Sequence, residues 1–191
     1  MSEYKHTADF GTTSAPLAVD LFYDYICPYC GIFENRNSSD IEQLVSDGTV
    51  YLRVHPLNFQ DRASNGTRYS SRAANDFLGV YHDDKETSLK FSDLLFEAQP
   101  AEGTPGLDDE VLAGLALRAG ASLEAIEAFA EHAWFEWLEQ CTQEALESGM
   151  EGTPALRVNG EWIVGGPGLQ YPLDYSKPGQ VKQLLEEAAG L

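Results

Sequence analysis

The feature that most constrains the fold is a run of mostly apolar residues that leads directly into two cysteines. Residues 17–26 read LAVDLFYDYI, a short apolar, aromatic and β-branched run that is typical of a buried strand. Cys27-Pro28-Tyr29-Cys30 follows at once. Proline is favoured in the first turn of a helix, where its missing N–H costs nothing. The sequence therefore predicts a strand followed by a helix, with Cys27 at the amino end of that helix.

The next residues extend this unit to strand, helix and strand. The helix is expected to stop near Gly48, and the polar run NRNSSD (35–40) indicates a place where it could break. Residues 49–59, TVYLRVHPLNF, predict a second strand that ends before Pro56. At this length the unit is expected to be a right-handed crossover between two parallel strands.

A helical block comes next. Apolar residues recur every three or four positions in residues 68–81, 88–99 and 108–120, which predicts three helices. Ser122 is expected to cap a longer helix that runs to about Gly149.

The carboxyl-terminal residues return to strands. TPALRV (153–158), Asn159-Gly160 and EWIVGG (161–166) together predict a hairpin with a type I′ turn. Residues 181–191 predict a final helix. The predicted fold class is therefore α/β, in the order βαβ, helical block, ββα.

The charge balance and the cysteine count exclude several classes of protein. The chain has 12 Lys and Arg against 31 Asp and Glu, a net charge of −19, so nucleic acids and anionic membranes are not expected partners. Three cysteines are too few for a disulfide framework. No window is long and apolar enough for a membrane span. The opening residues lack the apolar core of a signal peptide, so we expect either a cytosolic protein or an export signal or anchor that precedes this sequence.

The position of the two cysteines predicts thiol chemistry. Free backbone N–H groups and the helix dipole favour an anion at Cys27. Such a position lowers a thiol pKa from about 8.5 toward about 3.5–7.5. Cys27 is then the nucleophile that forms a mixed disulfide, and Cys30, one turn further and more buried, resolves it. Pro28 and Tyr29 are expected to tune the redox poise.

Three other uses of the CxxC pair have less support in the sequence. Zinc needs four ligands, but the chain offers one CxxC, a distant Cys141 and four histidines at unsuitable spacings, so no metal site is expected. A purely structural disulfide across so short a loop would constrain the unfolded chain little. A Cu(I)-binding chaperone stays open as a function of a different class, although no Met-rich or His-rich tract supports it.

Taken together, the segments resemble the DsbA family of thioredoxin-fold thiol–disulfide oxidoreductases. FYDYICPYCGIFE (22–34) is similar to the family's active-site strand and helix, and RVHPLNF (53–59) to the segment after its second strand. GTPALRVNGEWIVGG (152–166) is similar to the cis-proline loop and hairpin. YSSRAAN (69–75) and FEAQPAEG (96–103) resemble the actinobacterial or Gram-positive type.

The resemblance implies a domain organisation and a substrate site. A thioredoxin-like domain would comprise residues 15–62 and 149–191, with a helical domain (63–148) inserted and residues 1–14 as an extension. Thr153-Pro154 would be a cis peptide that faces the CxxC, and the Thr153 backbone would pair with an extended substrate. GGPG (165–168) would lie on the same rim. No metal or organic cofactor is expected; the partners would be proteins with thiols or disulfides and a redox partner that the sequence does not identify.

One departure from the family pattern concerns proton transfer. The buried acid that often stands six positions before the first cysteine is replaced by Leu21. Asp24 could tune the thiols or could be a solvated carboxylate at the strand end. His55 is interpreted as structural rather than as a proton shuttle. Cys141 lies on an apolar helical stripe and is expected to be a buried, inert thiol.

The direction of electron flow is left with two interpretations. The resemblance implies an extracytoplasmic oxidase that donates disulfides to exported proteins. If Met1 is the true start, a cytosolic reductase or an enzyme that depends on a low-molecular-weight thiol fits better. The glutaredoxin-like Pro-Tyr dipeptide between the cysteines mildly favours the second interpretation.

Overall fold

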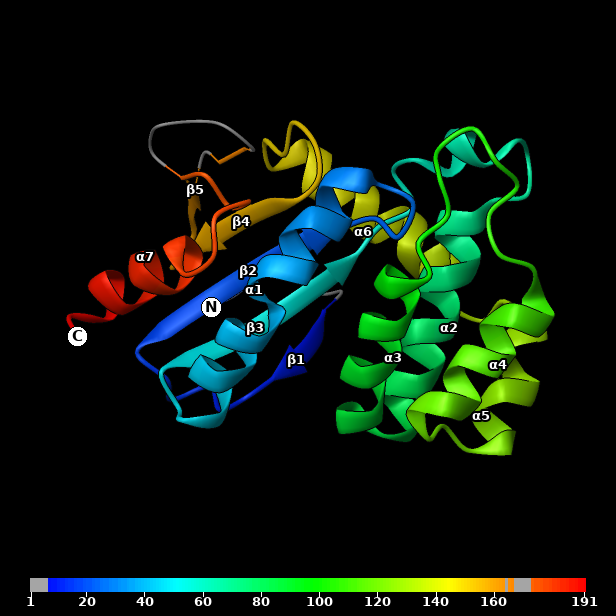
Figure 1. Ribbon diagram of the computed structural model, residues 1–191, viewed down its shortest axis with the longest axis horizontal. Helices are drawn as coiled ribbons and strands as arrows, with labels where there is room; N and C mark the ends of the chain where they lie inside the picture. The colour runs from blue at the N-terminus through cyan, green and yellow to red at the C-terminus, as the bar shows by residue number, and fades with distance from the viewer. Residues whose placement is uncertain (1–6, 164, 167–172) are drawn as a thin grey trace.

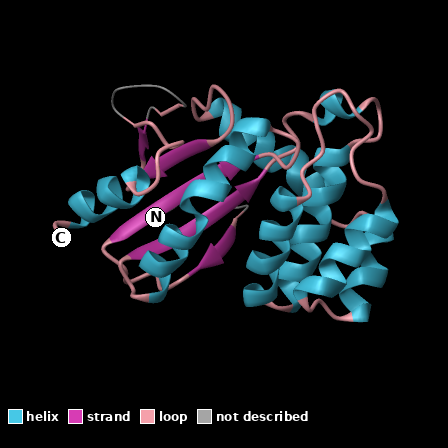
Figure 2. Cartoon of the chain, in the orientation of Figure 1, coloured by secondary structure: helices cyan, strands magenta, loops and turns pink. Residues whose placement is uncertain are grey.

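The computed structural model describes residues 7–163, 165–166 and 173–191. A five-stranded mixed sheet lies beside a group of helices, and α1 and α7 cover one face of the sheet (Figures 1 and 2). The sheet part contains the following elements: β1 (Ala8–Phe10), β2 (Leu17–Tyr23), α1 (Pro28–Ser46), β3 (Val50–Pro56), β4 (Ala155–Val158), β5 (Glu161–Ile163) and α7 (Gln180–Ala189). The helical part contains α2 (Tyr69–Asp83), α3 (Lys85–Glu97), α4 (Asp109–Ala119), α5 (Leu123–Glu127) and α6 (Phe135–Glu147), with 3₁₀ turns η1 (Asp61–Ser64) and η2 (Ala128–Glu131).

The sheet has the strand order β1-β3-β2-β4-β5. β2 is parallel to β3 and antiparallel to β4, which confirms the predicted strand–helix–strand unit. The prediction that the second strand ends before Pro56 was wrong, because Pro56 pairs with Tyr23. β1 reaches only as far as Val54 along the other edge of β3, so the missing N–H of Pro56 breaks no ladder bond there. β1 itself was not predicted and lies within the presumed extension.

The amino-terminal helix is unbroken, so the predicted break at residues 35–40 was wrong. The side chain of Asn35 donates a hydrogen bond to the Gly31 carbonyl, 2.8 Å away. The buried Asn37 donates to Phe33 and to Tyr175, a residue of the segment before α7. These asparagines therefore bond to the helix and to its neighbour instead of ending α1.

The single long helix predicted from Ser122 to Gly149 is in fact α5, η2 and α6. The chain turns at His132, which has a positive φ of 50°. Asn75 of α2 holds this turn: its amide donates to the Phe129 carbonyl (3.2 Å) and accepts from the Trp134 N–H (3.1 Å). The periodic apolar stripe could not reveal this break, because the residue that stabilises it lies more than fifty positions earlier.

The predicted hairpin turn is present. Asn159 and Gly160 both have positive φ, as a type I′ turn requires. The Asn159 side chain also accepts from the Ala18 N–H at 2.9 Å and so attaches the turn to β2. Val164 of the predicted second strand, and Pro167 and Gly168 of the GGPG loop, lie outside the described residues.

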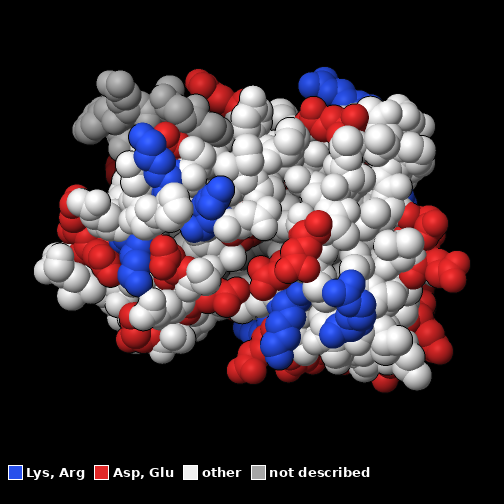
Figure 3. Space-filling view, in the orientation of Figure 1, with Lys and Arg blue, Asp and Glu red and all other residues white. Residues whose placement is uncertain are grey.

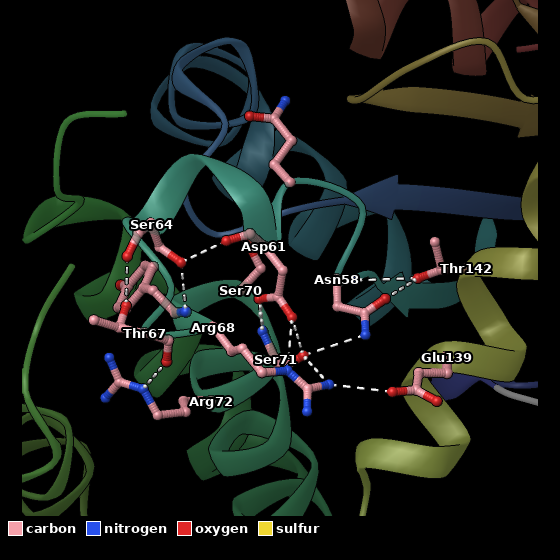
Figure 4. A network of polar contacts seen from close by, with 12 residues as sticks. Asn58, Asp61, Ser64, Thr67, Arg68, Ser70, Ser71, Arg72, Glu139 and Thr142 are labelled. Carbon is pink, nitrogen blue, oxygen red and sulfur yellow. Dashed lines mark hydrogen bonds and ion pairs between the residues drawn. The ribbon is translucent and has the colours of Figure 1, made fainter. Parts of the chain in front are cut away.

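A polar network joins the helical part to the connection between β3 and α2 (Figure 4). The Asp61 carboxylate accepts hydrogen bonds from the N–H and hydroxyl of Ser71 and pairs with Arg68. Arg68 also pairs with Glu139 of α6, and Asn58 exchanges hydrogen bonds with Thr142.

In the part of the chain that the structure describes, no helix is long and apolar enough to cross a membrane.

The Asn75 contacts lead to a prediction about stability. An Asn75→Ala variant should lose about 1–3 kcal/mol of unfolding free energy, because the Phe129 carbonyl and the Trp134 N–H lose their partner in a buried position. Urea unfolding followed by circular dichroism measures this loss. Gln143→Ala, which removes an exposed amide bonded to Glu147, is the matched control and should change the free energy by less than about 0.5 kcal/mol. Equal losses in the two variants would contradict this account of the turn.

Candidate active site

The dithiol lies where β2 passes into α1, as the sequence predicts. Cys27 is the N-cap residue of α1 with an extended backbone, and Pro28 occupies the first helical position. Both cysteines are free thiols, with Cys27 1% and Cys30 0% exposed. Tyr29, between them, is 53% exposed. The CPYC sequence thus presents one aromatic side chain to solvent and keeps the two sulfur atoms sheltered.

The surroundings of Cys27 favour its thiolate. The neighbouring Cys30 thiol is the largest of the influences that lower the pKa of Cys27 to about 6. Burial opposes this shift, while the Thr153 hydroxyl and the N–H groups of Cys30 and Tyr29 add to it. When protonated, the Cys27 Sγ donates to the Thr153 carbonyl at 3.3 Å. Cys27 is therefore largely ionised at neutral pH and fits the role of nucleophile.

Cys30 has the opposite character. Burial, and then the hydrogen bond and charge of Cys27, hold the pKa of Cys30 well above its ordinary value. The Asp24 N–H donates to the Cys30 Sγ at 3.4 Å. The Cys27 thiol thus loses its proton easily, whereas the Cys30 thiol keeps its proton. This is the asymmetry that an attacking and a resolving cysteine need.

The predicted cis peptide bond is present between Thr153 and Pro154. It lies against Cys27, as the hydrogen bond from Cys27 to the Thr153 carbonyl shows. A groove runs beside this loop, and its apolar lining includes Met150, Trp162 and Ile163. The surface over the amino end of α1 is largely uncharged in Figure 3. Pairing of a substrate strand with Thr153 stays a prediction.

Asp24 is not the solvated strand-end carboxylate of the alternative interpretation. It is 0% exposed, and its carboxylate accepts from the Ile26 N–H, the Gln60 N–H and the Ser70 hydroxyl at 3.0, 2.8 and 2.6 Å. Burial, with a smaller contribution from the Cys27 charge, raises the pKa of Asp24 to about 7 against these three bonds. A buried acid that titrates near neutrality and interacts with Cys27 therefore stands three positions before the dithiol.

A second acid lies on the side of the sheet where Leu21 replaces the usual carboxylate. Glu34 of α1 lines the same small cavity as Leu21 and Ile41. Burial, and then the charges of Asp93 and Glu42, raise the pKa of Glu34 to about 8. The sequence analysis did not single out Glu34, although its place four residues after Cys30 puts it on the same face of the helix as that cysteine.

His55 is built into the sheet. Its Nε2 lies 2.8 Å from Asp20 Oδ1, and its ring stacks on Phe22 at 4.1 Å between centroids. Burial lowers the pKa of His55 against the attraction of Asp20. Burial also disfavours the Asp20 carboxylate, but hydrogen bonds from His55 and Arg53 hold the pKa of Asp20 below its ordinary value. These contacts fit the structural interpretation of His55.

Cys141 is 1% exposed and packs in a cluster with Phe22, Leu57 and Met150. Burial raises the pKa of Cys141 far above its ordinary value. It is the buried thiol that the sequence predicts. Among the described residues, no group of three or more His, Cys, Asp or Glu side chains could hold a metal ion.

Gln99 is a site residue that the sequence analysis missed. It follows α3 and donates its side-chain amide to the carbonyls of Tyr25 (3.1 Å) and Cys27 (2.9 Å). A Cβ atom at Gly31 would collide with the Gln99 side chain. In the sequence, the FEAQ segment (96–99) indicates only the family resemblance and not this contact.

Comparison with known proteins decides the family. A family model described as DSBA-like thioredoxin domain matches residues 18–172. The chain belongs to this family. The resemblance and the thioredoxin-like fold predicted from the sequence are thus confirmed.

The DSBA-like domain also has curated relatives of a different length. It is 37% identical over 120 residues, 61% of the chain, to the serine/threonine-protein kinase PknE of Mycobacterium tuberculosis strain H37Rv and of Mycobacterium bovis. The match covers 21% of each kinase, so the chain spans only about a fifth of the length of these relatives.

Solved structures of thiol–disulfide oxidoreductases match most of the chain. The reduced disulfide bond oxidoreductase DsbG of M. tuberculosis is 25% identical with a TM-score of 0.77, covering 97% of this chain and 88% of that one. Oxidised M. tuberculosis DsbA is 25% identical with a TM-score of 0.77, covering 97% and 93%. MdbA, a thiol-disulfide oxidoreductase of Actinomyces oris, shares the fold at 23% identity, with a TM-score of 0.74 and coverage of 94% and 86%.

The asymmetry of the two thiols leads to a prediction about pH. In a Cys30→Ser variant, whose hydroxyl can still donate to Cys27, the ultraviolet absorbance of the thiolate should titrate well below the value of about 8.5 for a free cysteine. In the reduced wild type, the pKa near 6 means that this thiolate stabilises the fold fully above the pKa of an unfolded cysteine. That contribution is lost as the pH falls through about 6. A titration midpoint near the free-cysteine value would contradict the stabilisation of the Cys27 thiolate by its surroundings.

Proposed function

We propose that this DSBA-like domain is a thiol–disulfide oxidoreductase that works as an oxidase and forms disulfides in exported proteins. The observation that carries the direction is the stabilised Cys27 thiolate beside a Cys30 with a strongly raised pKa. Whatever stabilises the thiolate stabilises the reduced form of the protein. A dithiol with a stabilised reduced form gives its disulfide away readily, because the exchange equilibrium then favours the oxidised substrate.

The proposed reaction moves two electrons from the substrate to the protein. A substrate thiolate attacks Cys27 Sγ of the Cys27–Cys30 disulfide, so a mixed disulfide forms and Cys30 leaves and takes up a proton. A second substrate thiolate then attacks the substrate sulfur of the mixed disulfide and releases Cys27 as a thiolate. The substrate gains a disulfide, the domain becomes the dithiol, and a redox partner that accepts two electrons restores the disulfide.

The surface around the dithiol supports a protein as substrate. Cys27 is reached beside Tyr29 and Ile32, two side chains that are 53% and 36% exposed, and beside the groove along Thr153 and Pro154. An extended chain laid along this groove would place its own sulfur next to Cys27 and its backbone next to Thr153. An oxidase of this kind works where disulfides persist, and on that ground we propose an extracytoplasmic location.

The reduction potential tests the direction. Equilibration of the domain with glutathione redox buffers should give a potential near about −120 mV, the range of the strong oxidant DsbA. A value near about −270 mV, the range of thioredoxin, would overturn the oxidase and support the cytosolic reductase.

Cysteine variants test the assignment of the thiols. With a reduced, unfolded protein as substrate, Cys27→Ser should abolish disulfide formation. With a disulfide-bonded protein as substrate, the Cys27 thiolate of Cys30→Ser should attack the disulfide, displace one substrate thiolate and stay trapped as a mixed disulfide, which mass spectrometry detects as a covalent adduct. Cys141→Ala is the control and should retain the rate of the wild type. Stoichiometric Cu(I) binding by the reduced protein without exchange activity would instead favour the metal chaperone.

A further inference from the structure

The link between β2 and α1 is held from the helical domain. Residues 24–27 connect the last pairing residue of the central strand to the first turn of the active-site helix. Gln99, which follows the last residue of α3 by two positions, donates its Nε2 to two carbonyls of this link. A single amide group of the helical domain therefore bridges Tyr25 and the nucleophilic cysteine.

The Cys27 carbonyl is where this contact acts on the chemistry. The same oxygen accepts the N–H groups of Cys30 and Gly31, the first hydrogen bonds of α1, at 3.0 and 3.2 Å. Gln99 is the third donor, and at 2.9 Å it forms the shortest of the three contacts. Together they fix the plane of the Cys27–Pro28 peptide, and this plane sets how the N–H groups of Tyr29 and Cys30 are aimed at the Cys27 sulfur.

Two local features keep Gln99 in this place. Its own N–H donates to the Phe96 carbonyl at 3.3 Å, which continues the end of α3, and Pro100 follows it. Gly31 leaves the space that the side chain fills: the three heavy atoms nearest to a Cβ built at Gly31 all belong to Gln99. Gly31 has an ordinary helical backbone, so the glycine is needed there for the close approach of Gln99 and not for its backbone conformation.

We propose that Gln99 is a positioning residue through which the helical domain sets the reactivity of Cys27, and that Gly31 is the glycine that admits it. The amide directs the positive end of its dipole at the Cys27 peptide and holds the amino end of α1 in the orientation that stabilises the thiolate. The inference rests on the proposed function only in taking Cys27 as the nucleophile, since its test measures Cys27 itself. The helical part of the fold would then contribute to the chemistry of the dithiol.

Substitutions at position 99 test the role of the amide. Gln99→Met keeps the length of the side chain but cannot donate, and it should raise the pKa of Cys27 by about half a unit or more, the size expected from one lost hydrogen bond. Gln99→Glu places acceptors against two carbonyls and adds a negative charge, so it should raise the pKa further. Thiolate absorbance in the Cys30→Ser background and the pH dependence of alkylation of the reduced wild type both measure this shift.

The other groups that titrate around Cys27 stay constant across these variants. Asp24 at the end of β2, Cys30 of α1 and Tyr175 before α7 are the groups whose charges interact with Cys27. Ser92→Ala is the control at the same interface: it removes a buried hydroxyl that is bonded to the Tyr23 and Tyr25 hydroxyls and not to the Cys27 peptide. It should lower stability and leave the pKa of Cys27 unchanged.

A double-mutant cycle with Gly31 separates the specific effect of Gln99 on the pKa of Cys27 from a general loss of stability. Gly31→Ala in the wild type should displace Gln99 and raise the pKa of Cys27 as Gln99→Ala does. In the Gln99→Ala background the added methyl group has room, so Gly31→Ala should produce no further shift and should stabilise α1, because alanine is the better helix former.

The outcomes separate this inference from the proposed function. Non-additive shifts at Gly31 and Gln99 support the inference whatever the reduction potential of the domain. An unchanged pKa in Gln99→Met and Gln99→Glu, or equal shifts in Ser92→Ala, would overturn it even if the domain oxidises proteins. A reductant-like potential with intact shifts would overturn only the oxidase.

Discussion

In the proposed function, the chemistry depends on the negative charge of the Cys27 sulfur. A lone thiolate in a sheltered position is unfavourable unless dipoles and hydrogen-bond donors compensate it. Here the amino end of α1, the Cys30 thiol and the Thr153 hydroxyl do so together. The first two belong to the first turn of α1, whereas Thr153 lies in the loop before β4, so the sulfur is stabilised by all three only when α1 and this loop are both in place.

The helical part of the fold takes part in this arrangement through residues 24–27, the link that precedes α1. Ser70 of α2 and the Gln60 N–H hold the Asp24 side chain, and Gln99 holds two carbonyls of the link. Figure 4 shows that Ser70 stands next to a network in which Asp61 fixes the first turn of α2. The helices therefore hold the link through hydrogen bonds to its side chain and backbone.

Two other acids lie near the position where Leu21 replaces the usual carboxylate. Leu21 faces α1, and Glu34 approaches the same cavity from that helix. Asp24, three residues closer to the dithiol along the chain, is buried, and its charge interacts with that of Cys27. Both acids have a pKa raised toward neutrality, which is the property that a proton acceptor or donor near neutral pH needs.

The sequence by itself determined the parts of this protein that depend on local chemistry. The run before Cys27, the Pro28 helix start, the Asn159-Gly160 turn and the fold class follow from periodicity, propensity and turn conformation, which act over a few residues. Only the tertiary structure decided the rest. The break between α5 and α6 depends on Asn75, the burial of Asp24 on Ser70 and Gln60, and the anchoring of Cys27 on Gln99. Each of these is a hydrogen bond between residues far apart in the chain, and a pattern read along the chain contains no information about which distant side chain will fill a donor or acceptor.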